Sequence, residues 1–201
     1  MASFVALLSA VAGVSLWKIT QHRQQSSTGA LIVLPEPRVI ADFALVDHDE
    51  QAFTLDSLRG RWSLIFFGFT HCPDVCPSTL YDLQMVHKSL RQGMGDEQPV
   101  HQVLFVSVDP ERDTPEKLGQ YVSHFDPDFI GVTGNQQQLA PLTRQLGIAY
   151  RIEPHEPGSM QYGVDHSVSI LVTDPQGRLH GVFPAPHDAD RMIQDLTATF
   201  E

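Results

Sequence analysis

Two cysteines, Cys72 and Cys76, lie four positions apart and are the only cysteines of this 201-residue chain. On a helix, residues four apart lie one turn apart on the same face, with Cα atoms about 6 Å apart. A disulfide can close across that distance, and the reduced pair offers two soft thiolate ligands to a metal. The spacing therefore leaves two chemistries open, a redox couple and part of a metal site.

A metal site needs a third ligand, and the chain offers ten histidines. His166 is the preferred candidate, because it follows a long loop and directly precedes an apolar run. His155 is a weaker candidate in that loop, and the other histidines are expected in the N-terminal linker, a helix, turns or the ends of elements. Two thiolates with one imidazole suit copper first and zinc second.

The side chains next to these three candidate ligands allow more than one interpretation. His71 would favour the Cys72 thiolate, or is simply an exposed surface residue. Asp165 is expected either to orient His166 through a hydrogen bond or to cap a turn. Asp74 would add negative charge beside the metal or present a surface to a partner.

The polar segment that follows the apolar residues 103–108 contains further residues that could shape the site. Asp109, Arg112 and Asp113 are predicted to form an ion-pair network that shapes a loop near the site. Thr114 followed by Pro115 predicts a helix with a threonine N-cap and proline at its first position.

Apolar runs of strand length alternate with helical repeats along the chain. Residues 62–69 and 103–108 are predicted to be strands buried on both faces. Cys72 is expected at or just before the next helix, whose free amides and dipole favour a thiolate. The other expected elements are short strands at 38–46 and near Phe53, helices at 80–93 and from Thr114, a strand at 129–132, a helix at 135–147 that Pro141 would kink or split, an extended segment at 148–152, a hairpin at 167–172 and 179–183, and a helix from about 188. This order predicts an α/β fold, a thioredoxin-like sandwich with a central mixed sheet, in which a strand leads directly into the cysteine pair.

The chain divides into three parts. Residues 1–17 carry no charged side chain and are mostly apolar, which favours an N-terminal transmembrane or signal anchor; a cleavable signal peptide ending near Ala12 is the alternative. Residues 18–36 are expected to be a flexible linker, and residues 37–201 a single thioredoxin-like domain. The formal charge of -11 argues against sequence-independent binding of nucleic acid, which needs a basic surface.

Three separated motifs carry a resemblance to a known family: Gly68-Phe-Thr-His-Cys-Pro-Asp-Val-Cys-Pro77, Val106-Ser-Val-Asp-Pro-Glu-Arg-Asp-Thr-Pro115 and Val164-Asp-His-Ser167. Together they resemble the Sco/SenC family of copper-handling thioredoxin-fold proteins, over about residue 37 to the C-terminus. The resemblance implies that Cys72, Cys76 and His166 bind copper, as Cu(I) or Cu(II). It also implies a single-span anchor and a role in building the dinuclear copper centre of cytochrome c oxidase subunit II.

The leading hypothesis is a membrane-tethered copper metallochaperone, not an enzyme in the ordinary sense, that delivers copper to subunit II. Its expected partners are subunit II or its assembly factors and other copper chaperones. A bacterial inner membrane with the domain facing the periplasm is favoured over the mitochondrial inner membrane facing the intermembrane space. The alternative is a thiol-disulfide oxidoreductase that keeps the partner's copper-site cysteines reduced. A peroxidase is disfavoured, because the residues before Cys72 lack the usual peroxidatic motif.

Overall fold

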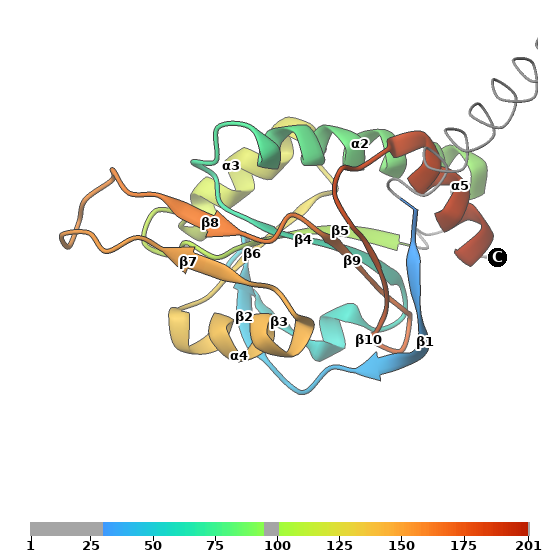
Figure 1. Ribbon diagram of the computed structural model, residues 1–201, viewed down its shortest axis with the longest axis horizontal. Helices are drawn as coiled ribbons and strands as arrows, with labels where there is room; N and C mark the ends of the chain where they lie inside the picture. The colour runs from blue at the N-terminus through green and yellow to red at the C-terminus, as the bar shows by residue number, and fades with distance from the viewer. Residues whose placement is uncertain (1–29, 95–100, 201) are drawn as a thin grey trace, which may run out of the picture.

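The computed structural model describes residues 30–94 and 101–200. Its centre is an eight-stranded mixed sheet with the strand order β1-β10-β9-β4-β5-β6-β2-β3. Helices cover both faces: in Figure 1, α2, α3 and α5 lie above the sheet and α4 lies below it. This three-layer arrangement is the predicted α/β sandwich.

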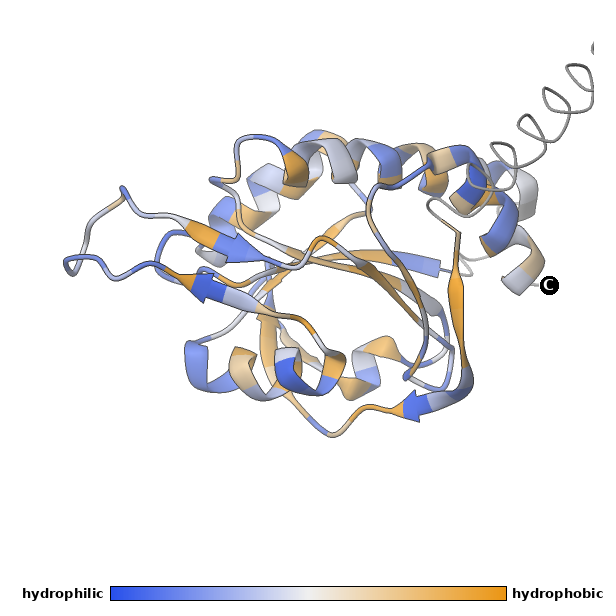
Figure 2. Ribbon diagram, in the orientation of Figure 1, coloured by the Kyte–Doolittle hydropathy of each residue, from blue (hydrophilic) through white to orange (hydrophobic). Residues whose placement is uncertain are grey.

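The two long apolar runs form the middle of the sheet. β4 (Trp62–Gly68) and β5 (His101–Ser107) pair in parallel, and β6 (Ile130–Thr133) extends the parallel part. Successive side chains point to opposite faces, so Leu64 and Phe66 pack into one core and Ile65 and Phe67 into the other. Figure 2 shows apolar residues gathered on these central strands.

Antiparallel strands complete the sheet on both sides. On one side, β9 (Ile170–Thr173) pairs with β4, β10 (Arg178–Phe183) with β9, and β1 (Ile32–Val39) with β10. On the other side, β2 (Ala44–Asp47) pairs with β6 and with β3 (Ala52–Thr54). The predicted hairpin near the C-terminus is thus confirmed as β9 and β10.

The helices begin and end at residues with clear local causes. They are α2 (Val75–Met94), α3 (Pro115–Phe125), α4 (Gln136–Leu146) and α5 (Ala189–Phe200), with a short 3-10 helix, η1 (Leu55–Leu58). The Thr114 side chain accepts a hydrogen bond from Lys117 N, with Pro115 at the first position, as predicted. Asn135 forms a capping box at α4, and Gly147 ends that helix in the left-handed conformation.

Two expectations about these elements were wrong. β1 begins at Ile32, inside the segment expected to be linker, and the single strand expected over residues 38–46 is divided between β1 and β2. Pro141 does not split α4, which is continuous through it, because the exposed proline removes only one backbone bond while a capping box and buried leucines hold the helix.

A second, two-stranded sheet stands apart from the main one. β7 (Tyr150–Ile152) and β8 (Val164–His166) pair antiparallel and are joined by the long loop of residues 153–163. In Figure 1 this hairpin extends from the side of the molecule, beyond the first turn of α2.

The predicted anchor, residues 1–17, lies outside the described residues, as does most of the predicted linker. Among residues 30–94 and 101–200, no helix combines the length and the apolar character needed to span a bilayer.

Candidate metal centre

The two cysteines lie where the chain passes from β4 into α2. Cys76 is in the first turn of α2 and fully buried, whereas Cys72 is half-buried in the preceding loop. Cys72 thus lies just before the helix, as expected, and the one-turn geometry considered for a cysteine pair on a single helix does not apply, because α2 begins only at Val75. The Cys72 amide instead donates to the Phe69 carbonyl at 3.2 Å, which closes a tight turn. Both thiols are free.

His166, at the end of β8, completes a three-residue cluster with the cysteines. Its Nε2 lies 3.4 Å from Cys76 Sγ, and the two sulfurs and a His166 ring nitrogen all lie within 4.8 Å of one another. His166 Nδ1 lies 2.9 Å from the Ser167 carbonyl oxygen. Because a carbonyl can only accept, Nδ1 carries the proton and Nε2 presents its lone pair to the sulfurs.

Burial sets the protonation of this cluster. It lowers the pKa of His166 below its ordinary value, so the neutral imidazole is the form present at neutral pH. It raises the pKa of the Cys76 thiol far above its ordinary value, and the charge of Cys72 adds to the effect. A metal must therefore displace a proton from Cys76 when it binds. Two sulfurs and one neutral imidazole are a soft donor set that fits copper.

A glycine allows α2 to approach the end of β4. A Cβ added to Gly68 would lie 2.7 Å from Cys76 Sγ and 2.7 Å from a Phe105 ring carbon. A side chain at this position would therefore displace the sulfur from its present position 3.4 Å from His166 Nε2. Tyr121 lies on the other side of the thiols, and its buried hydroxyl has no hydrogen-bond partner among the described residues. Its pKa is raised by burial first and then by the charges of Cys76 and Cys72, so it remains a phenol.

Asp165 does not take the expected orienting role. Its carboxylate accepts from Arg151 Nη2 at 2.8 Å, and both side chains are largely exposed. Neighbouring residues of a strand point to opposite faces, so Asp165 points to solvent while His166 points to the cysteines. The Ser167 carbonyl orients the ring in its place.

The predicted ion-pair network consists of two groups that Ser107 joins, since its hydroxyl accepts from Asp109 N and donates to Asp113. In the first, the buried Asp109 accepts from Arg112 Nε at 2.5 Å and from the Tyr162 hydroxyl at 2.6 Å. The Arg112 guanidinium also stacks over the Tyr162 ring at 3.6 Å and donates to the Tyr162 carbonyl at 3.0 Å. This group fastens the loop before β8, and hence the approach to His166, to the loop after β5.

In the second group, the buried Asp113 holds the cysteine loop. It accepts from Thr70 N at 2.9 Å, from Thr70 Oγ1 at 2.5 Å and from Ser107 Oγ at 2.6 Å. His71 is exposed, with Nδ1 3.1 Å from Thr70 Oγ1. Asp74 is also exposed, and its carbonyl accepts from Ser78 N in the first turn of α2.

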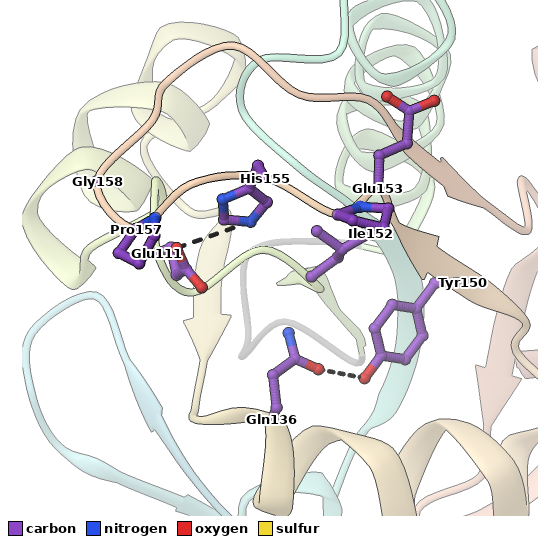
Figure 3. Close-up of a pocket in the computed structure, with 9 residues that line it drawn as sticks. Glu111, Gln136, Tyr150, Ile152, Glu153, His155, Pro157 and Gly158 are labelled. Atoms are coloured by element: carbon purple, nitrogen blue, oxygen red, sulfur yellow. Dashed lines mark hydrogen bonds and ion pairs between the residues drawn. The ribbon is translucent and has the colours of Figure 1, made fainter.

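His155, the weaker candidate, lies in a different place. It stacks on Tyr162, with ring centroids 3.7 Å apart, and its Nε2 is 3.8 Å from Glu111 Oε2. His155 and Glu111 both line a cleft of about 730 Å³, and Figure 3 shows His155 paired with Glu111, and Gln136 paired with Tyr150 farther along the same cleft.

Sequence reasoning missed the residues that shape the centre without binding metal. Gly68 was visible at the end of an apolar run, where a glycine indicates close approach of another backbone. Tyr162 acts through a hydrogen bond to Asp109, 53 positions away. Tyr121 acts through its burial near the two thiols. A single sequence carries no signal for either contact.

Comparison with known proteins gives a consistent result. A family model described as SCO1/SenC matches residues 34–201. The mitochondrial SCO2 homolog of Mus musculus is 35% identical over 176 residues, which cover 88% of this chain and 67% of that protein. The structure of yeast Sco1 with copper bound superimposes with a TM-score of 0.74 at 31% identity, over 81% of this chain and 88% of that one. These similarities confirm the predicted thioredoxin-like fold. They also confirm the predicted membership of a family with copper-bound members.

A more distant solved structure shares the fold. BsSco is described as a member of the Sco family of cytochrome c oxidase assembly proteins with a disulfide switch. It is 24% identical, with a TM-score of 0.62 over 84% of this chain and 97% of that one. At that identity the likeness shows the fold alone.

Proposed function

Because this chain belongs to the SCO1/SenC family, we propose that it is a copper metallochaperone that supplies the dinuclear copper centre of cytochrome c oxidase subunit II. Cys72, Cys76 and His166 bind the copper. The observation that carries the proposal is the convergence of two sulfurs and an imidazole lone pair within 4.8 Å, from segments 90 positions apart. A dithiol redox couple alone needs no such histidine.

The geometry suits transfer by exchange of ligands. Cys76 lies at the bottom of the site and Cys72 at its half-exposed edge. A thiolate of the receiving protein can therefore reach the copper from the Cys72 side and replace the donor sulfurs one at a time. Cys76 takes up a proton as the copper leaves, because burial favours its neutral form. No electron needs to move in this exchange.

The proposed setting is a membrane surface. The uncharged residues 1–17 would act as an anchor and residues 18–29 as a tether, with the folded part in the periplasm of a bacterium. Subunit II, its assembly factors and other copper chaperones are the proposed partners. This placement rests on the apolar N-terminal sequence and the resemblance to the family.

Copper binding by the purified full chain tests the proposal. The wild type should bind copper in equimolar amount, with sulfur-to-copper charge-transfer absorption when loaded with Cu(II). His166→Ala should lower the affinity at least about tenfold and shift that absorption. His155→Ala removes a histidine outside the cluster and should change neither. Equal copper binding by His166→Ala and His155→Ala would contradict the proposal.

A thiol-disulfide oxidoreductase is the second candidate, favoured by the free thiols of a half-exposed and a buried cysteine lying side by side. Here Cys72 attacks a partner disulfide, and Cys76 then displaces the partner, so that two partner thiols are formed and Cys72–Cys76 becomes the disulfide. Reduction of an oxidised subunit II copper-site peptide, compared between wild type and His166→Ala, separates the two functions. Redox turnover survives the loss of His166, whereas copper delivery does not.

A further inference from the structure

A second group of potential metal ligands lies about three turns along α2 from Cys76. His87 on α2 faces Asp126 and Asp128, which lie in the loop between α3 and β6. A ring nitrogen and one oxygen of each carboxylate all lie within 4.8 Å of one another. None of these residues belongs to the copper site.

His87 is buried but its outer nitrogen is unsatisfied. The side chain is 3% exposed, and Nε2 makes no hydrogen bond with any described residue. Nε2 lies 3.5 Å from Asp128 Oδ2 and 3.9 Å from Asp126 Oδ1. These gaps are too long for hydrogen bonds. They are close to the edge of a tetrahedron of N and O ligands around zinc, about 3.4 Å for bonds of about 2.1 Å.

The inner nitrogen of His87 has a partner that fixes the ring. Nδ1 lies 3.0 Å from Nε2 of the buried His101. In the tautomer in which His101 Nε2 accepts, His87 Nδ1 donates and His87 Nε2 turns its lone pair toward the two carboxylates. Three acceptors then face one another, an arrangement that a cation between them stabilises.

The cluster is open to solvent on one side. His87 and Asp126 line a cavity of about 260 Å³, together with Lys88, Arg91 and Gln92. Arg91 Nη1 forms an ion pair with Asp128 Oδ2, the same oxygen that faces His87. The Arg91 side chain is 46% exposed, so it can turn toward solvent when a cation takes its place.

We propose that His87, Asp126 and Asp128 form a second metal site, for a divalent ion of borderline softness such as Zn²⁺ or Cu²⁺. One imidazole and two carboxylates suit such ions, whereas Cu(I) prefers the thiolates of the copper site. An ion bound here cross-links α2 to the loop before β6. Arg91 competes with the ion for Asp128.

Zinc titration of the full chain carrying Cys72→Ser, Cys76→Ser and His166→Ala tests this site with the copper ligands removed. Zinc should bind in equimolar amount, measured by calorimetry and by competition with a chromophoric chelator, and should raise the melting temperature. Asp128→Asn should weaken binding at least about tenfold. Asp42→Asn, which removes an exposed carboxylate elsewhere, should leave binding unchanged, and Arg91→Gln should strengthen it.

The same comparison in the wild type, with its copper site filled with Cu(I), guards against misfolding of the triple variant. Failure to bind zinc in both backgrounds overturns the inference, and so does equal binding by Asp128→Asn and Asp42→Asn. Either result would leave Arg91 and Asp128 as an ordinary ion pair beside His87. Zinc binding that survives Asp128→Asn but is lost in His87→Gln would also reject the proposed ligand set.

Discussion

At the scale of single residues, the copper site depends on close approach as much as on its ligands. Gly68 lies against both Cys76 Sγ and Phe105 in the core. Cys76 is fully buried, so its sulfur can move only by displacing its neighbours. A change of one methyl group at position 68 therefore acts on the fold and on the site together.

Gly68→Ala should lower the free energy of unfolding by about 1–3 kcal/mol, because the added methyl overpacks the core. It should also weaken copper binding, because Cys76 Sγ must move away from the strand. Urea unfolding and copper competition measure the two effects. Gly93→Ala, where an added Cβ meets nothing within 4 Å, is the control; it should be neutral or slightly stabilising. Equal stability of the two variants would contradict this account.

The three proposed ligands could be named from the sequence because a cysteine pair of this spacing and a histidine before an apolar run are local features, and the structure brings them together. The role of Asp165 could not be predicted, because a neighbour in sequence is not a neighbour in space when the segment is a strand. Asp165 and His166 leave β8 on opposite sides, toward Arg151 and Cys76 respectively. His166 is oriented by the backbone carbonyl of Ser167, and its segment is held by Tyr162 through Asp109. Neither contact leaves a recognisable pattern of residue types in the sequence.

At the scale of elements, the central strands could be predicted from their continuous apolar runs, and the helices from their apolar periodicity and capping residues. The start of the edge strand β1 could not be predicted in this way, because Pro35 and Pro37 are typical of a linker. Both prolines lie between Val33 and Arg38, where the pairing register with β10 shifts. Prolines are tolerated at such an irregularity on an edge strand, since no ladder bond is needed there. The absence of a split at Pro141 has a related reason, since packing and caps outweigh one missing backbone bond.

Tyr162→Phe tests how the loop before β8 positions His166. The change removes the 2.6 Å hydrogen bond to the buried Asp109 carboxylate, which should cost about 1–3 kcal/mol of stability. Copper should also dissociate faster, because the segment leading to His166 is less firmly held. Stopped-flow transfer to a copper chelator measures the rate. Tyr81→Phe, at a half-exposed position on α2, should match the wild type, and a similar rate for both variants would rule out this role.

At the scale of the whole molecule, two separate cores pack on the two faces of one sheet. The buried pair His87 and His101 lies at the end of the first core, where Phe129 and Phe200 contact the rings. Such a pair makes the stability of the entire fold depend on pH. Composition could show ten histidines, but not that two of them are buried together.

Stability should fall as the pH drops from about 6.5 to about 4. The folded-state pKa of His101 is lowered to about 4 by burial, His87 and Arg91, so in this window the unfolded chain binds a proton that the folded chain does not. The contribution is fully present above pH 6.5 and amounts to about 3 kcal/mol. Urea unfolding at several pH values should show a smaller loss for His101→Gln than for the wild type. His124→Gln, at an exposed position, should keep the wild-type slope; equal slopes for all three proteins would refute the assignment.

The hairpin of β7 and β8 is a separate two-stranded sheet that carries His166, one of the three proposed copper ligands. Its position and the retention of copper are therefore linked, and linkage is reciprocal. A receiver that docks more tightly on the hairpin of the loaded protein must, by the same factor, make that protein hold its copper more tightly. Recognition of the cargo thus opposes its release. Delivery then requires the receiver's own thiolates to compete for the metal after docking, and tighter docking alone would slow it.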